Sequence, residues 1–227
     1  MAISSIVRIL GPVLAAGFLF GSVGQADRQK IDRLWALDSL VGEERFTLRQ
    51  TLDRLAGTQP LRDEDRLALG ILYVHLHLRD PDLEHARRAE DHLRGIENEP
   101  LKKEPLTLVY LGMASSFKAR AKTLFGVTDL ENMKACFEAI PEDHPDWFIR
   151  FLRGTTYLQV GKNLPHLRYF ADFKTKAVHY GRNDLLYVLD RYAKHPLEEF
   201  RLETYDLETD GVPLAIKKRC EAALGSL

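Results

Sequence analysis

The chain has 227 residues, of which 45% are hydrophobic and 29% are charged, and this balance is typical of a folded globular protein or a short repeat array. Its formal net charge is -1, whereas proteins that bind nucleic acid by neutralising phosphates normally carry a basic face. The composition therefore argues against bulk disorder and against a nucleic-acid partner.

Residues 1–26 resemble a secretory signal peptide. A basic start containing Arg8 precedes an uncharged apolar run over residues 9–23, and Gly24-Gln25-Ala26 supplies small residues for a cleavage site. The apolar run is shorter than the roughly twenty residues of a membrane span. We therefore expect an exported protein, periplasmic or secreted, with a cleaved leader. The alternative is an uncleaved signal anchor, the one way in which this chain would be held at a membrane.

Residues 27–57 are predicted to form a helical hairpin. Apolar residues recur at helical spacing on both sides of Gly42, and Gly57 closes the second helix. This hairpin lacks the glycine motif that follows it in the chain. It is therefore interpreted as a terminal unit that caps an array.

A glycine motif recurs from residue 62 onward. Three glycines stand at intervals of 42 residues (112 minus 70, and 154 minus 112), each inside an apolar segment long enough for a helix: Gly70, Gly112 and Gly154. The third residue after the glycine is Tyr73 in the first copy, serine in the second and tyrosine in the third. A glycine inside a helix lowers the stability of the helix by roughly 1 kcal/mol relative to alanine. Three glycines at the same position of a repeat therefore predict that paired helices approach each other closely there. A period of this size indicates an internal helical repeat.

Each glycine helix is predicted to be followed by a return helix. The first pair spans residues 62–79 and 82–96, and Asp80-Pro81 would cap the second of these helices. The second pair spans 106–124 and about 128–140, with a capping box at Thr128 to Glu131. These two pairs give the first two repeats.

The third glycine helix is predicted over residues 147–160, and its return helix ends near Gly181. Beyond it, separate helices are expected over residues 183–194 and 213–224, with a mixed segment between them. The three repeats therefore cover residues 62–180, and residues 183–227 form a carboxy-terminal cap. The mature chain, 27–227, is expected to be one domain.

These motifs resemble tetratricopeptide repeats. The family's first helix carries Leu-Gly-x-x-Tyr, which residues 69–73 match in full, and residues 154–157 match without the leucine. Phe170 follows Tyr157 at the family's own spacing, whereas His166 stands where the family has alanine, and the interval of 42 residues exceeds the usual one. The resemblance implies an all-α fold, an α-solenoid of antiparallel helical hairpins wound into a right-handed superhelix.

The same resemblance implies a concave groove on the first helices of the repeats. Its candidate lining is mostly apolar: Leu67, Ile71, Val74, His75, Val109, Met113, Phe117, Phe151, Thr155 and Leu158. Such a groove would hold an extended apolar peptide or an amphipathic helix of a partner protein. The alternative is that the protein fills the groove itself, because an exposed patch this apolar is costly.

No local motif points to catalysis, a cofactor or a metal. The sequence contains no nucleophile elbow, phosphate loop or Cys-x-x-Cys. His75 and His77 are two residues apart, which places them on different faces of a helix, and His85 and His92 lack an evident third ligand. We therefore predict no enzyme activity, no cofactor and no metal site.

Two cysteines, Cys136 and Cys220, lie on predicted helices. They are interpreted first as two separate buried thiols. The alternative is a disulfide that clamps the end of the array, which an oxidising compartment would permit.

The predicted function is an exported interaction module or adaptor that binds a peptide or a partner helix in the apolar groove. The alternative function is a carrier that encloses a small hydrophobic ligand in the same concavity.

Overall fold

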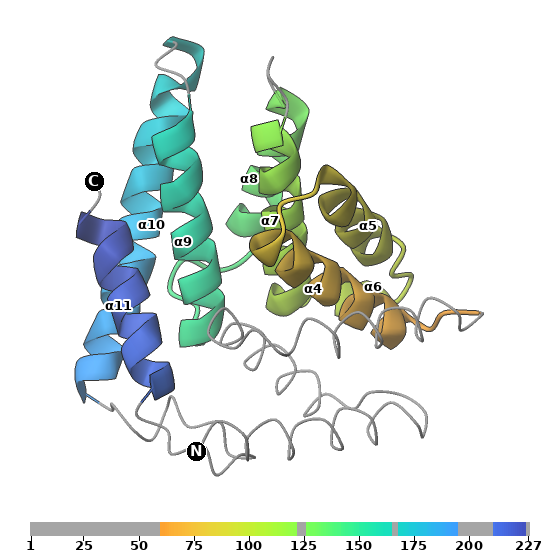
Figure 1. Cartoon of the computed structure of the whole chain (residues 1–227), viewed down its shortest axis with the longest axis horizontal. Coiled ribbons are helices and arrows are strands. Elements are labelled where there is room, and N and C mark those ends of the chain that lie inside the picture. Colours follow the sequence, from red (N-terminus) through yellow and green to blue (C-terminus); the bar gives the residue numbers. More distant parts are fainter. Residues whose placement is uncertain (1–59, 122–125, 165–167, 195–210, 226–227) are drawn as a thin grey trace. The chain divides into compact units, whose positions relative to one another are not determined.

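The computed structural model describes residues 60–121, 126–164, 168–194 and 211–225, and within these ranges the fold is all-α, without strands (Figure 1). The chain divides into two compact units, one of residues 1–102 with 204–207 and one of residues 103–203 with 208–227. The boundary lies in the proline-bracketed link between the first two predicted repeats.

The first unit contains α4 (Asp63–Arg79), α5 (Leu83–Arg94) and the short α6 (Glu99–Lys102). Three acidic residues, Asp63, Glu64 and Asp65, occupy the first turn of α4, where they complement the helix dipole. The Asp63 carboxylate also accepts hydrogen bonds from the backbone N–H groups of Glu97 and Asn98, at 3.1 and 2.7 Å. The start of α4 is thereby tied to the chain that follows α5.

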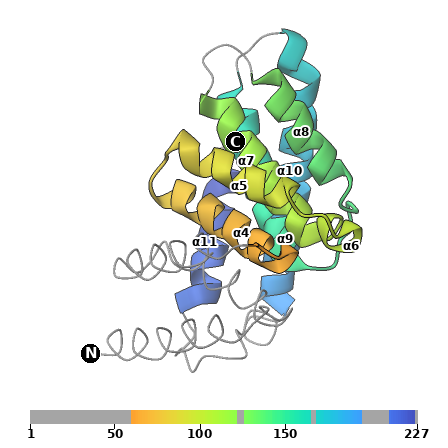
Figure 2. The same ribbon diagram turned by 90° about the vertical axis from the view of Figure 1, so that its right-hand side faces the viewer.

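The second unit contains α7 (Pro105–Ala121), α8 (Val127–Glu138), α9 (Trp147–Asn163), α10 (Arg168–Lys194) and α11 (Gly211–Gly225). The helix α9 is its centre, because α9 packs against α7, α10 and α11. Most residues of α9 are buried, and α7 and α8 lie side by side (Figure 2). A helix surrounded in this way is apolar on more than one face, as the sequence of α9 is.

The three repeat glycines lie at contacts between paired helices, as their equal spacing along the chain predicted. A β-carbon on Gly70 would lie 2.6 Å from Cδ2 of Leu93 in α5, and one on Gly112 would lie 2.6 Å from Cδ1 of Phe137 in α8. A β-carbon on Gly154 would lie 2.8 Å from Cβ of Asp184 in α10. At Gly70 and Gly112 a side chain would have to move to admit a β-carbon, whereas at Gly154 the Cβ of Asp184 and the backbone of α10 block it.

Paired helices run in opposite directions. In the third pair, Gly154 approaches Asp184, whereas Gly161, later in α9, approaches Val178, which is earlier in α10. In the second pair, Gly112 meets Phe137 and the later Lys118 forms an ion pair with the earlier Asp129, at 3.1 Å. The helices within these two pairs are therefore antiparallel.

The expected break at Gly181 is wrong, because α10 is one continuous helix of 27 residues. A β-carbon on Gly181 would lie 2.9 Å from the backbone oxygen of Gly154 and 2.9 Å from Cδ2 of Leu158. Gly181 thus allows α9 and α10 to approach closely, and it does not end the helix. The third return helix and the helix expected at residues 183–194 are the same element.

Two predicted helix caps also differ. Asp82, and not Asp80, caps α5, since its carboxylate accepts a hydrogen bond from the Glu84 N–H at 2.9 Å. The helix α8 begins at Val127 with Gly126 as N-cap, so Thr128 lies inside the helix and forms no capping box.

Several predicted features lie outside the described residues. They are the leader over residues 1–26, the capping hairpin over 27–57 and the mixed segment over 200–209. These features stay predictions. Among the described residues, no helix is both long enough and apolar enough to cross a bilayer.

Candidate functional site

The predicted groove residues are buried, with one exception. In the first unit, Leu67, Ile71, Val74 and His75 of α4 are covered, and in the second unit so are the candidates on α7 and α9 apart from Thr155. Thr155 is half-buried, and its hydroxyl donates to the backbone oxygens of Phe151 and Leu152 in its own helix. This burial is what the self-filled alternative expects. A groove open to a partner stays a prediction.

A cavity of about 230 Å³ lies in the second unit. It is formed by the end of α8, the turn that follows it, α9 and α10. Its lining combines three aromatic rings, three carboxylates, one guanidinium and two small apolar residues: Phe137, Glu138, Ile140, Pro141, Glu142, Arg153, Tyr157, Tyr180 and Asp184. Aromatic walls with a few convergent polar groups are typical of binding sites.

Arg153 forms the polar side of this cavity, and all five of its N–H groups are engaged. Nη1 donates to the backbone oxygens of Ile140 and Pro141, at 3.0 and 3.1 Å, and Nη2 donates to that of Glu142, at 3.0 Å. Nε and Nη2 form a bidentate pair with Asp184, at 2.7 and 2.9 Å. Arg153 therefore holds the α8–α9 turn against α10 and offers no donor to an incoming anion.

Asp184 also binds a second arginine. Arg150 Nε donates to its Oδ1 at 2.9 Å, and the Arg150 guanidinium stacks 3.9 Å from the centre of the Tyr187 ring. The Tyr187 hydroxyl in turn donates to the backbone oxygen of Pro145 at 2.9 Å. Arg150, Arg153 and Asp184 are all buried, so the cluster carries one net positive charge inside the unit.

The aromatic side of the cavity is built from α8, α9 and α10. The rings of Phe137 and Tyr157 meet edge to face with their centres 4.9 Å apart, and Tyr180 lies 6.0 Å from Tyr157. Burial raises the pKa of the Tyr157 hydroxyl well above its usual range, and the negative charges of Glu138 and Asp184 contribute to the same shift. Tyr157 therefore stays neutral.

Two carboxylates of the lining are exposed to solvent, those of Glu138 and Glu142. Glu138 lies 3.8 Å from the ammonium group of Lys134, a pair whose side chains are both about half exposed. Exposed pairs of this kind contribute little to stability and are screened by salt. The mouth of the cavity is thus acidic, whereas its interior is aromatic.

No sequence motif marked Arg150, Arg153 and Asp184. A signal was nevertheless present, because two arginines three residues apart share one face of an otherwise apolar α9. Buried cations need a counter-charge, so this spacing predicts a buried carboxylate nearby. The partner itself stands 31 residues after Arg153, and the choice among the many acidic residues depends on helix packing.

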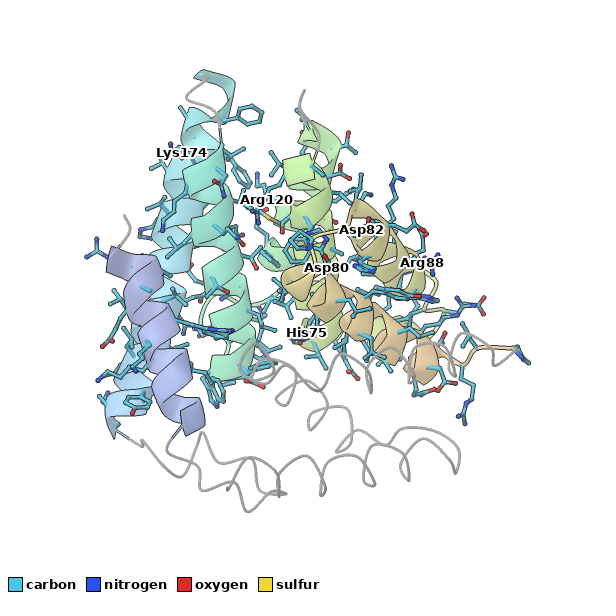
Figure 3. All side chains as sticks on the ribbon, in the orientation of Figure 1. His75, Asp80, Asp82, Arg88, Arg120 and Lys174 are labelled. Atoms are coloured by element: carbon cyan, nitrogen blue, oxygen red, sulfur yellow. The ribbon has the colours of Figure 1, made fainter. Side chains whose placement is uncertain are left out.

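The histidines of the first unit contact polar and aromatic groups. Nδ1 of His77 lies 2.7 Å from the backbone oxygen of Asp82, and His92 stacks on Tyr73 with ring centres 5.7 Å apart. Burial lowers the pKa of His92, so this ring tends to be neutral. Figure 3 shows Asp82 at the α4–α5 turn and Arg88 on α5, where Arg88 donates to the Tyr73 hydroxyl at 3.2 Å. Within the described ranges, no group of three or more His, Cys, Asp or Glu side chains is placed to hold a metal ion.

Cys136 and Cys220 are both buried, and no disulfide joins them in this structure. Burial, aided by the neighbouring charge of Glu221, raises the pKa of Cys220 to about 12. The thiolate is the reactive form, so this cysteine is protected both by burial and by its protonation.

We expect neither Cys136 nor Cys220 to react with a thiol reagent at about pH 8 while the protein is folded, and both to react after denaturation. Intact mass spectrometry after alkylation, with and without denaturant, measures this. A denatured, unreduced protein without reactive thiols would instead indicate the disulfide.

No protein-family model, curated protein or solved structure matches the chain. The resemblance to tetratricopeptide repeats therefore rests on the motif residues alone.

Proposed function

We propose that this protein is an exported helical-repeat binding module, an adaptor that holds a partner protein. In this proposal its helix pairs are successive repeats of a right-handed, tetratricopeptide-like solenoid. Stacked repeats of this type form extended concave surfaces suited to partner binding. The proposed location, periplasmic or secreted, rests on the signal-like pattern of residues 1–26.

The close contact between each repeat glycine and the following helix is the observation that supports this proposal. In each of three antiparallel pairs, the glycine of the first helix lies against a side chain of the second: Leu93, Phe137 and Leu185. The joints recur at a constant interval of 42 residues, counted from Gly70 to Gly112 and from Gly112 to Gly154. One supersecondary unit used three times is the construction of a repeat protein, and repeat proteins commonly work through their surfaces.

The cavity of the second unit is the binding element that this proposal uses. The apolar groove candidates are already covered, whereas Tyr180, Glu138 and Glu142 line a cavity and keep access to solvent. At about 230 Å³ the cavity is smaller than the roughly 300–1,000 Å³ of sites for drug-sized ligands. It suits one side chain of a partner better than it suits an enclosed hydrophobic ligand.

The proposal is tested by cross-linking the tagged, full-length chain in its native cells and identifying proteins and extracted lipids by mass spectrometry. We expect one partner protein whose purified form binds the purified chain directly, as measured by isothermal titration calorimetry. Recovery of a lipid alone, or of proteins that do not bind the purified chain, would contradict the proposed function.

A further inference from the structure

We propose that the cavity between α8, α9 and α10 takes the side chain of an arginine or lysine from the partner protein. The inference rests on the proposed binding function and specifies its chemistry. Three features of the second unit carry it: the engaged donors of Arg153, the aromatic wall, and the acidic mouth.

The guanidinium in the lining is not available to an anionic guest. Its one guanidinium, that of Arg153, has its five N–H groups bonded to Asp184 and to three backbone oxygens. Binding a phosphate or carboxylate would require breaking those bonds, which also hold the α8–α9 turn. An anion would in addition meet the carboxylates of Glu138 and Glu142 at the mouth.

A cationic guest finds complementary groups instead. Asp184 is bound by two arginines, so that buried cluster has a net charge of +1 (two guanidinium groups and one carboxylate), whereas Glu138 and Glu142 together contribute -2. The lining itself holds one guanidinium and three carboxylates, a net charge of -2 (one minus three). Arg150 and Lys134 both lie outside the lining, and the pair of Lys134 with Glu138 is weak and exposed.

The aromatic wall favours a cation over a neutral polar group. Tyr157 and Tyr180 present ring systems to the cavity, and ring faces attract a cation placed within about 6 Å of their centres. The aliphatic stem of an arginine or lysine that enters the cavity would pass the glutamates, and its charged end would lie against the tyrosine rings. A long basic side chain matches a site that is aromatic inside and acidic at its mouth.

The test uses the full-length chain and three blocked pentapeptides, Ac-Ala-Ala-X-Ala-Ala-amide, in which X is arginine, its neutral isostere citrulline, or glutamate. Saturation-transfer NMR measures the dissociation constants. We expect the arginine peptide to bind at least about fivefold more tightly than the citrulline peptide, and the glutamate peptide to bind least. The preference should weaken as salt rises from about 50 to about 300 mM, because the carboxylates at the mouth are exposed.

The double variant Glu138→Gln/Glu142→Gln should lose the preference for arginine over citrulline. The matched control, Glu97→Gln/Glu131→Gln, removes two exposed carboxylates outside the lining and should keep it. Circular dichroism checks that both variants are folded. Equal binding of the arginine and citrulline peptides to the wild-type chain, or tighter binding of the glutamate peptide, would overturn the inference.

Partner binding by the same variants separates this inference from the proposed function. If the partner binds the wild-type chain and Glu138→Gln/Glu142→Gln equally well, the inference that the cavity takes a basic side chain is wrong, and the proposed binding function is retained. If no partner binds at all, the proposed function fails. Dimerisation of the wild-type chain in sedimentation, lost in the double variant, would assign the cavity to a second copy of this chain and also overturn the inference.

Discussion

Replacing Asp184 with alanine is expected to lower the free energy of unfolding by about 3–5 kcal/mol. The carboxylate of Asp184 is the counter-charge for two buried arginines, with N–O distances of 2.7–2.9 Å. Its removal leaves Arg150 and Arg153 as uncompensated cations inside the second unit, and the desolvation of an unpaired charge is much more costly than the loss of an exposed ion pair. Urea denaturation of the full-length chain measures the change.

Asp190→Ala is the matched control for Asp184→Ala. Asp190 is on the same helix, but its ion pair with Lys194, at 2.7 Å, is exposed, so its loss should cost less than about 1 kcal/mol. A second variant tests the cause: Arg150→Met, added to Asp184→Ala, removes one unpaired cation and should restore part of the lost stability. If Asp184→Ala costs no more than Asp190→Ala, the buried cluster does not stabilise the fold as described.

Gly154→Ala is expected to lower the free energy of unfolding by about 1–3 kcal/mol, even though alanine is the better helix former by about 1 kcal/mol. The new β-carbon would lie 2.8 Å from Cβ of Asp184, 2.9 Å from Leu185 Cδ2 and 3.1 Å from the backbone oxygen of Gly181. Backbone and Cβ atoms cannot rotate away, so α9 and α10 must separate. That separation would also lengthen the bonds between the arginines of α9 and Asp184.

The same substitution at Gly161, seven residues later in α9, serves as the control for Gly154→Ala. A β-carbon there would meet Val178 Cγ2 at 3.1 Å, and its other neighbours lie at 3.7 Å. The end of one valine side chain can move by a few tenths of an ångström, and the higher helix propensity of alanine offsets that cost. We expect Gly161→Ala to be close to neutral in thermal and urea denaturation. Equal losses at both positions would show that the α9–α10 joint does not depend on glycine at Gly154.

The sequence by itself determined the helical architecture and the joints between paired helices. Apolar periodicity placed α4, α9 and α11 within three residues of their observed bounds, because it records which faces of a helix are buried. The interval between Gly70, Gly112 and Gly154 predicted close contacts, because glycine inside a helix carries a cost that packing must offset. These are local signals, each contained in one helix.

Only the tertiary structure decided where α10 ends and which carboxylate pairs with the buried arginines. Gly181 has the same local signature as a helix terminator, and its contact with Gly154 is what explains the uninterrupted α10. Arg150 and Arg153 required a counter-charge, but the choice of Asp184 depends on which turn of α10 packs against α9. The cavity follows from the same packing, because its lining comes from three helices and a turn that periodicity describes only one at a time.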